Sequence, residues 1–174
     1  MISQNCFPDF ITVCIAGAGT DTELLKFADD VGMSFEPVNI FVNKMLVRYM
    51  IKDKFQIICS RKIISGCSIL KAVALGADIC NSAREFMFSL GCIQAMQWNN
   101  NECPTGVTTQ DKMLMKELVV KDITERVFNF HINTLHSAKE LLTAASKKSF
   151  AGVDINIFIH GDEFTHLSDL YFSK

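Results

Sequence analysis

The fold of this chain is decided by residues 55–84, which read FQIICSRKIISGCSILKAVALGADICNSAR. The stretch begins with Phe55–Ser60, an apolar run rich in β-branched isoleucine, which is typical of a buried strand. A loop follows, and Ser65 then stands where a helix N-cap is expected, while Gly76 is suited to end that helix. The stretch therefore predicts a strand that is followed by a helix, which is the repeating unit of a parallel sheet.

The same alternation extends on both sides of this stretch. Upstream, residues 9–16 predict another apolar strand, which is followed by a short helix over 20–31 and a second helix over 36–50. Downstream, residues 77–81 predict a third strand, and residues 82–96 predict a helix. Short strands that alternate with helices predict an α/β fold with a parallel sheet, whose chemistry lies at the carboxyl ends of the strands.

Helical spacing of apolar residues predicts which faces are buried. The helix over 36–50 should bury one stripe, formed by Val38, Phe41, Val42, Met45, Leu46, Tyr49 and Met50. After a polar loop over 99–106, a long helix over 122–146 should face inward with Ile123, Val127, Phe130, Leu135, Ala138, Leu141 and Leu142. In the tail, an alternating piece over 153–159 fits more than one type of element.

Composition sets the class of protein. The chain has 174 residues, of which 49% are apolar and 21% charged, with a formal net charge of −2. This balance favours one globular domain over a disordered chain, and it provides no overall attraction to nucleic acid or to an anionic membrane. The N-terminus lacks the basic flank of a secretory signal, and the longest uncharged stretch is too short to span a membrane. We therefore expect a cytoplasmic protein whose seven cysteines are reduced.

Several long motifs resemble the FMN-binding domain of glutamate synthase. They are Gly76–Arg84, Met87–Ala95 and Cys103–Gln110, together with Pro8–Val13, Lys62–Gly66 and Arg126–His131. The resemblance covers almost the whole chain and is weakest beyond about Lys148. It implies a (β/α)8 barrel, called a TIM barrel, that holds FMN and a [3Fe-4S] cluster. The implied activity is that of an FMN-dependent oxidoreductase forming L-glutamate from 2-oxoglutarate and glutamine-derived ammonia.

The length of the chain limits how much of such a barrel it contains. A complete (β/α)8 barrel takes about 250 residues and eight strands, whereas this sequence predicts three strands. We therefore expect a partial TIM barrel, in which residues 1–148 form about the last three βα units with C-terminal helices and residues 149–174 form the tail of the same domain. A second chain would have to supply the missing barrel strands, and 2-oxoglutarate or glutamate would be the small-molecule substrate of the assembly.

Two loops after neighbouring strands are candidates for the flavin phosphate. Such a site needs backbone N–H groups and a cation that converge on one point. The candidate residues are Ser60, Arg61, Lys62 and Gly66 in one loop, and Ser82, Ala83 and Arg84 in the next. Lys62 and Arg84 are the expected cations, and the alternative is that both are ordinary solvated charges at strand ends.

The cysteines differ from the family pattern. The family resemblance implies three cluster ligands spaced C-x5-C-x4-C, and the corresponding positions here are Cys92, Trp98 and Cys103. An indole cannot bind iron, so Cys92 and Cys103 are the two metal-ligand candidates that are left. Cys67 or Cys80 could replace the third ligand only by lying near them in space.

Other departures also fall on the loops that should face the ligand. Three glycines of the family's first loop are lost where this chain has Ile15, Ala18 and Asp21, and Cys14 stands where the family has a carboxylate. Arg61 and Glu85 each replace a glycine. These changes support a second hypothesis beside the enzyme: a decayed, cofactor-free remnant or a subunit-interaction module without catalysis. The sequence identifies no catalytic residue.

Overall fold

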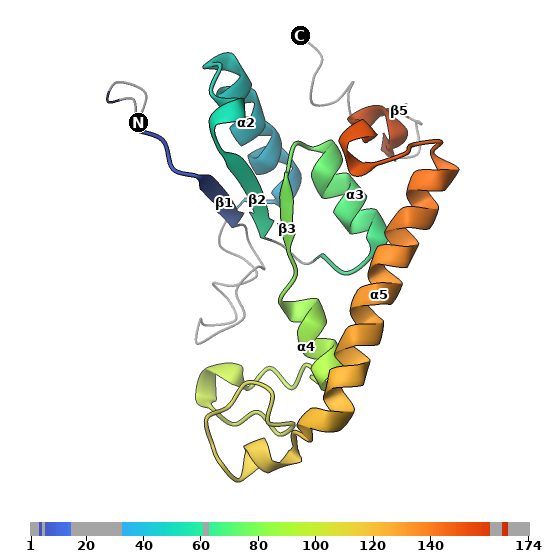
Figure 1. Cartoon of the computed structure of the whole chain (residues 1–174). Helices are drawn as coiled ribbons and strands as arrows, with labels where there is room; N and C mark the ends of the chain where they lie inside the picture. The colour runs from blue at the N-terminus through green and yellow to red at the C-terminus, as the bar shows by residue number, and fades with distance from the viewer. Residues whose placement is uncertain (1–3, 5, 15–32, 61–62, 161–164, 167–174) are drawn as a thin grey trace.

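The computed structural model describes residues 4, 6–14, 33–60, 63–160 and 165–166. The expected helix over 20–31 lies outside these residues. Figure 1 shows the remaining elements in chain order. They are β1 (Phe10–Cys14), α2 (Phe35–Arg48), β2 (Gln56–Ser60), α3 (Gly66–Ala74), β3 (Ile79–Asn81), α4 (Arg84–Leu90), α5 (Val120–Ala144), β4 (Ile159–His160) and β5 (Thr165–His166), with 3-10 turns at Lys52–Lys54, Trp98–Asn100 (η3), Leu114–Glu117, Phe150–Gly152 (η5) and Ile155–Ile157.

The three longer strands form one parallel sheet in the order β1-β2-β3, as the sequence predicts. Val13 of β1 pairs with Cys59 of β2, which in turn pairs with Cys80 of β3. The start of β3 is also held by a side chain, because the backbone N–H of Ile57 donates to the carboxylate of Asp78 at 2.8 Å. Strands β4 and β5 form a separate antiparallel pair.

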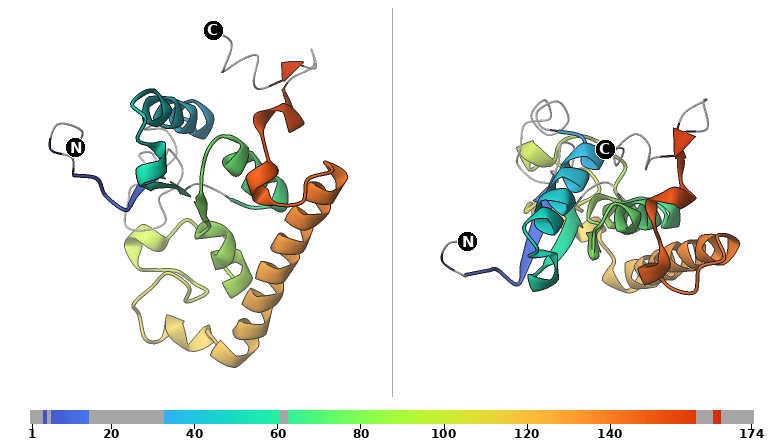
Figure 2. Two further views of the ribbon diagram at one scale, coloured as in Figure 1. Left: turned by 45° about the horizontal axis from the view of Figure 1, so that its top comes forward. Right: turned by 90° about the horizontal axis from the view of Figure 1, so that it is seen from above.

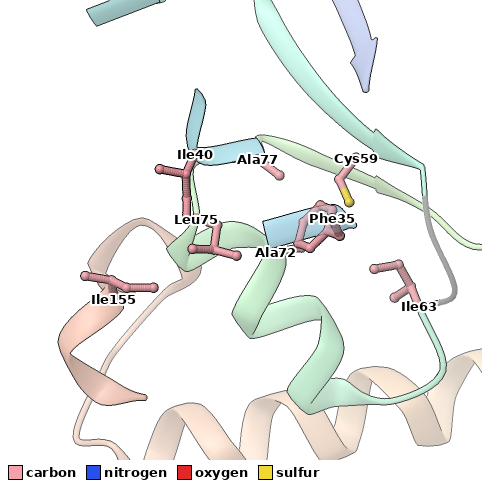
Figure 3. Close-up of a cluster of buried hydrophobic side chains, with 8 residues drawn as sticks. All are labelled: Phe35, Ile40, Cys59, Ile63, Ala72, Leu75, Ala77 and Ile155. Atoms are coloured by element: carbon pink, nitrogen blue, oxygen red, sulfur yellow. The ribbon is translucent and has the colours of Figure 1, made fainter. Parts of the chain in front are cut away.

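Helices α2 and α3 cover the same face of this sheet. One buried cluster joins Phe35 and Ile40 of α2 with Ala72 of α3 and its C-cap Leu75 over Cys59 of β2, and Figure 3 shows these side chains together. A second cluster joins the other end of α2 to β1 and β2 and contains Val13, Leu46, Ile51, Phe55 and Ile57. Burial of these apolar side chains is the main force that fixes both helices on this face.

The opposite face of the sheet is not covered by any described residue. Side chains alternate along a strand, so the residues next to the buried Val13, Ile57 and Cys59 point to the other side. Those residues are Phe10, Thr12, Cys14, Gln56, Ile58, Ser60, Ile79 and Asn81, and each is exposed or half-buried. Helices on one face only are the arrangement of a barrel wall, whereas a doubly wound sheet has helices on both faces.

The long helix α5 lies away from β1 and β2, alongside α3 and α4 (Figures 1 and 2). The ring of Phe86 on α4 meets the ring of Phe130 on α5 edge to face, with centroids 5.1 Å apart. Ala138 and Leu142 are the buried residues of α5. The predicted inward face of α5 is therefore correct at these two positions, whereas Leu135 is 44% exposed because no described element covers it.

Two further expectations about the helices are wrong. Helix α4 ends at Leu90 and not near Met96, because Gly91 adopts a left-handed conformation with φ of 108°. The stripe predicted for α2 includes residues that face solvent, since Phe41 is 63% and Met50 88% exposed. The residues of α2 that are buried are Phe35, Asn39, Ile40 and Leu46.

Candidate functional site

The carboxyl ends of the three parallel strands place three polar side chains in one row. Cys14, Ser60 and Asn81 are paired in register across β1, β2 and β3, and all three lie on the uncovered face of the sheet. Neighbouring strands are about 4.8 Å apart, so these side chains are adjacent. The sequence predicts Ser60 as a site residue and residues 81–84 as a strand-end loop, and the register between β2 and β3 shows that Ser60 and Asn81 are adjacent.

Ser82, in the loop after β3, lies within hydrogen-bond distance of two neighbouring segments. The Ser82 hydroxyl lies 2.9 Å from the backbone oxygen of Ile63 and 3.1 Å from Oε2 of Glu85. Glu85 is only 1% exposed, although it stands in the first turn of α4. Ser82 therefore joins the loop before α3 to the start of α4, and its hydroxyl is already engaged by protein groups.

Gly66 lies where two helices approach each other most closely. A Cβ atom at this position would lie 2.3 Å from the backbone nitrogen of Ala138 in α5, which is far below any normal contact. Gly66 is thus required for the packing of α3 against α5. This role in packing explains the glycine without any ligand.

A mostly apolar groove of about 470 Å³ lies between β3, α3, α4 and α5. Its walls include Cys80 of β3, Val73 of α3, and Phe130 and His131 of α5. No strand pairs with the outer edge of β3 within the described parts of the chain. The groove and this edge together form a surface that the described residues leave open.

A family model described as a conserved region in glutamate synthase matches residues 2–148. The chain belongs to the glutamate synthase family. The resemblance inferred from the motifs is thereby confirmed.

Individual glutamate synthases agree with this assignment. A protein of Bacillus subtilis named "glutamate synthase large subunit-like protein YerD" is 37% identical over 142 residues, which are 82% of this chain and 27% of the relative. An "archaeal glutamate synthase [NADPH]" of Methanocaldococcus jannaschii is 32% identical over 75% of this chain and 26% of its own length. The chain thus spans about a quarter of the length of these curated relatives.

Several of the residues that the family resemblance assigns to FMN make contacts within the protein. Gly66 packs against the backbone of α5, and the Ser82 hydroxyl lies within hydrogen-bond distance of the Ile63 backbone oxygen and of Glu85 Oε2. The buried Glu85 carboxylate would repel a phosphate in the same turn of helix. Arg61 and Lys62 lie outside the described residues, Ala83 is exposed at the N-cap of α4, and Arg84 borders a small cavity together with Cys92 and Trp98.

The residues that the family resemblance assigns to the [3Fe-4S] cluster do not fit a cluster. Cys92 and Cys103 provide two thiols, and the third position is the indole of Trp98. Within the described ranges, no three His, Cys, Asp or Glu side chains are grouped so that they could hold a metal ion. Neither Cys67 nor Cys80 therefore completes the ligand set.

Cys103, one of the two predicted cluster ligands, has hydrogen-bond partners within the protein. Cys103 is 6% exposed, and its sulfur lies 3.4 Å from the Thr105 hydroxyl. Burial opposes ionisation of this thiol, but hydrogen bonds from Thr105 and Thr108 outweigh that effect and lower its pKa from 9.0 to about 6. These hydrogen bonds favour the thiolate form of Cys103 over the thiol.

None of the helices in the described part of the chain is both long enough and apolar enough to cross a lipid bilayer.

Proposed function

We propose that this chain is a segment of a glutamate synthase-type barrel and that it acts only when other strands complete the barrel. The observation that carries the proposal is the one-sided sheet: three consecutive parallel strands have α2 and α3 on one face and no described cover on the other. In a TIM barrel the helices form an outer ring and the opposite face of the sheet points inward. Residues 1–148 would supply the last three βα units, and residues 149–174 the tail.

The surfaces that would receive the remaining strands are already present. Neither the outer edge of β1 nor that of β3 is paired among the described residues, so both offer backbone N–H and C=O groups to a further strand. The groove beside β3 would take apolar side chains of a strand added at that edge. The proposed partner is thus a polypeptide that carries the other strands of a glutamate synthase-type barrel.

The row Cys14, Ser60 and Asn81 would lie inside the completed barrel, at the end where barrel enzymes have their active sites. We assign to that assembly the family activity, formation of L-glutamate from 2-oxoglutarate and glutamine-derived ammonia in the cytoplasm. FMN would supply the transfer of reducing equivalents. Lys62 and Arg84 would be the cations that hold its phosphate.

A second function is favoured by one specific observation. The Ser82 hydroxyl lies within hydrogen-bond distance of the buried Glu85 carboxylate, so protein side chains already occupy the start of α4. This arrangement suits a cofactor-free interaction module that stabilises a barrel without contributing to its chemistry.

Co-expression separates the two functions. Residues 1–174 would be produced with the barrel strands of the Bacillus subtilis relative that precede its matching region, and the purified complex would be examined for visible flavin absorbance. A yellow complex supports the FMN-dependent assembly, whereas a colourless complex supports the interaction module. The variant Glu85→Gly, which removes the carboxylate, should increase flavin retention if that group opposes the phosphate. Failure to form any complex would refute the barrel-segment proposal.

A further inference from the structure

The loop that follows α4, residues 91–113, differs from what the family resemblance implies at a position expected to bind the cluster. We call it the cysteine loop. The resemblance implies that three thiolates in this loop hold a cluster, but Trp98 stands at the second ligand position. The indole nitrogen carries a hydrogen and has no free lone pair to offer iron. Two thiolates and an indole are not a ligand set for a [3Fe-4S] cluster.

The two remaining cysteines have different surroundings. Cys92 borders a small cavity of about 30 Å³ together with Trp98 and Met96, and Cys103 is not among the residues around it. Cys103 is buried and is hydrogen-bonded by Thr105. Trp98 and Cys92 thus border one cavity, whose wall also includes Met87 and Phe88, while Cys103 lies within hydrogen-bond distance of Thr105.

The cysteine loop is closed by hydrogen bonds that connect its two halves. The Thr109 hydroxyl donates to the backbone oxygen of Asn101 at 2.6 Å, and the backbone N–H of Gln110 donates to Oδ1 of Asn101 at 2.6 Å. Thr109 in turn accepts from the backbone N–H of Asp111 at 3.0 Å. Asn101 has a φ of 65°, a left-handed conformation that asparagine tolerates better than most residues. These contacts join residues 101 and 109–111 through protein groups.

We propose that the cysteine loop is a metal-free structural unit, in which the Trp98 indole and the Asn101–Thr109 hydrogen bonds hold the chain where the family resemblance implies a cluster. This proposal is independent of whether the completed barrel binds FMN. It assigns Trp98 and Asn101 a structural role that can be measured in the 174-residue chain itself.

The test uses anaerobic incubation with ferrous iron and sulfide, followed by desalting, iron and sulfide analysis, and limited proteolysis of the loop with and without a chelator. Four chains would be compared: the unchanged protein, Trp98→Ala, Asn101→Gly and the control Asn100→Gly. Glycine at 101 keeps the left-handed backbone and removes only the side chain. Asn100 is exposed, and its side chain makes no hydrogen bond with the described part of the chain, so its replacement controls for added backbone freedom.

The proposal expects no stoichiometric iron or sulfide in the unchanged chain and the same rate of loop cleavage with and without chelator. It also expects several-fold faster cleavage within residues 97–113 for Trp98→Ala and Asn101→Gly than for Asn100→Gly. Stoichiometric iron and sulfide, or faster cleavage of the unchanged chain in chelator, would overturn it. Equal cleavage of all four chains would overturn the structural role of Trp98 and Asn101.

Discussion

At the scale of single residues, the most buried polar side chain joins two helices. Asn39 of α2 is fully buried, and its Nδ2 donates to the backbone oxygen of Leu75 at 2.8 Å. Leu75 is the C-cap of α3, where backbone carbonyls lack partners within the helix. The amide therefore satisfies a buried carbonyl that water cannot reach. Its Oδ1 has no hydrogen-bond partner among the described residues. The bond from Nδ2 to the Leu75 oxygen is therefore the hydrogen bond that offsets the cost of burying this amide.

We predict that Asn39→Ala lowers the free energy of unfolding by about 1–3 kcal/mol, because the Leu75 carbonyl is left buried without a donor. The matched control is Asn133→Ala on the exposed side of α5, which should change stability by less than about 0.5 kcal/mol. Urea denaturation of both variants measures the difference. Equal stability of the two variants would contradict the role assigned to Asn39.

Cys103 leads to a prediction about pH. Burial alone would raise the pKa of this thiol, but hydrogen bonds from Thr105 and Thr108 lower it to about 6, against an ordinary value of 9.0. In the folded protein, thiolate absorbance in the ultraviolet should therefore be lost as the pH falls through about 6. The measurement is the difference in absorbance between the unchanged chain and Cys103→Ser across the pH range. A transition near the ordinary value would show that the threonines do not stabilise the thiolate.

The same pKa shift has a consequence for stability. When folding lowers the pKa of a group, the group stabilises the folded protein at high pH. This contribution is complete above the pKa in the unfolded chain, and it is lost as the pH falls through the pKa in the folded chain. Thermal unfolding of the unchanged chain, relative to Cys103→Ser, should thus occur at increasingly higher temperature from about pH 6 to about pH 9.

At the scale of elements, Gly66 sets the distance between α3 and α5. We predict that Gly66→Ala destabilises the chain by about 1–3 kcal/mol or more, because its Cβ would lie 2.3 Å from the Ala138 backbone, which cannot easily move. The matched control is Gly152→Ala, where the nearest atom is the Lys147 Cδ at an ordinary 3.8 Å. Denaturant unfolding compares the two. If Gly66→Ala is as stable as Gly152→Ala, the two helices are not in close contact.

The boundaries of elements show what a sequence can and cannot predict. Ser65 was correctly predicted to cap α3, and its hydroxyl accepts from the backbone N–H of Ser68, because capping depends only on neighbours in the chain. The end of α4 was missed, since Gly91 stops the helix while the apolar pattern continues to Met96. Phe41 was assigned to a buried stripe but is exposed. The spacing of apolar residues predicts one face of a helix, but it does not predict how much of that face is covered by other elements.

At the scale of the whole molecule, the parallel sheet followed from the alternation of strands and helices, but the arrangement of the candidate site did not. Ser60 was found because it ends an obvious strand, whereas its adjacency to Cys14 and Asn81 depends on the register between strands. Register is fixed by which faces are buried, and Val13, Ile57 and Cys59 set it here. The contacts of Gly66 and Ser82 within the protein likewise depend on tertiary structure, so the sequence motifs do not predict them.

The uncovered face and edges of the sheet lead to the last prediction, that the isolated chain of 174 residues associates with itself. Phe10 is 55% and Ile79 41% exposed, and each lies on the uncovered face of an outer strand. Unpaired backbone groups beside exposed apolar side chains favour pairing with another sheet. Phe10→Lys and Ile79→Lys should therefore reduce association, because a charge at a sheet edge opposes such pairing.

Size-exclusion chromatography with light scattering measures this association over a range of protein concentrations. The control is Val120→Lys, which places the same charge at a 75% exposed position at the start of α5, away from the sheet. If the edges cause association, the two edge variants shift toward monomer and the control does not. An unchanged chain that stays a monodisperse monomer at every concentration would show that the open sheet needs no partner, and it would weaken the barrel-segment proposal along with this prediction.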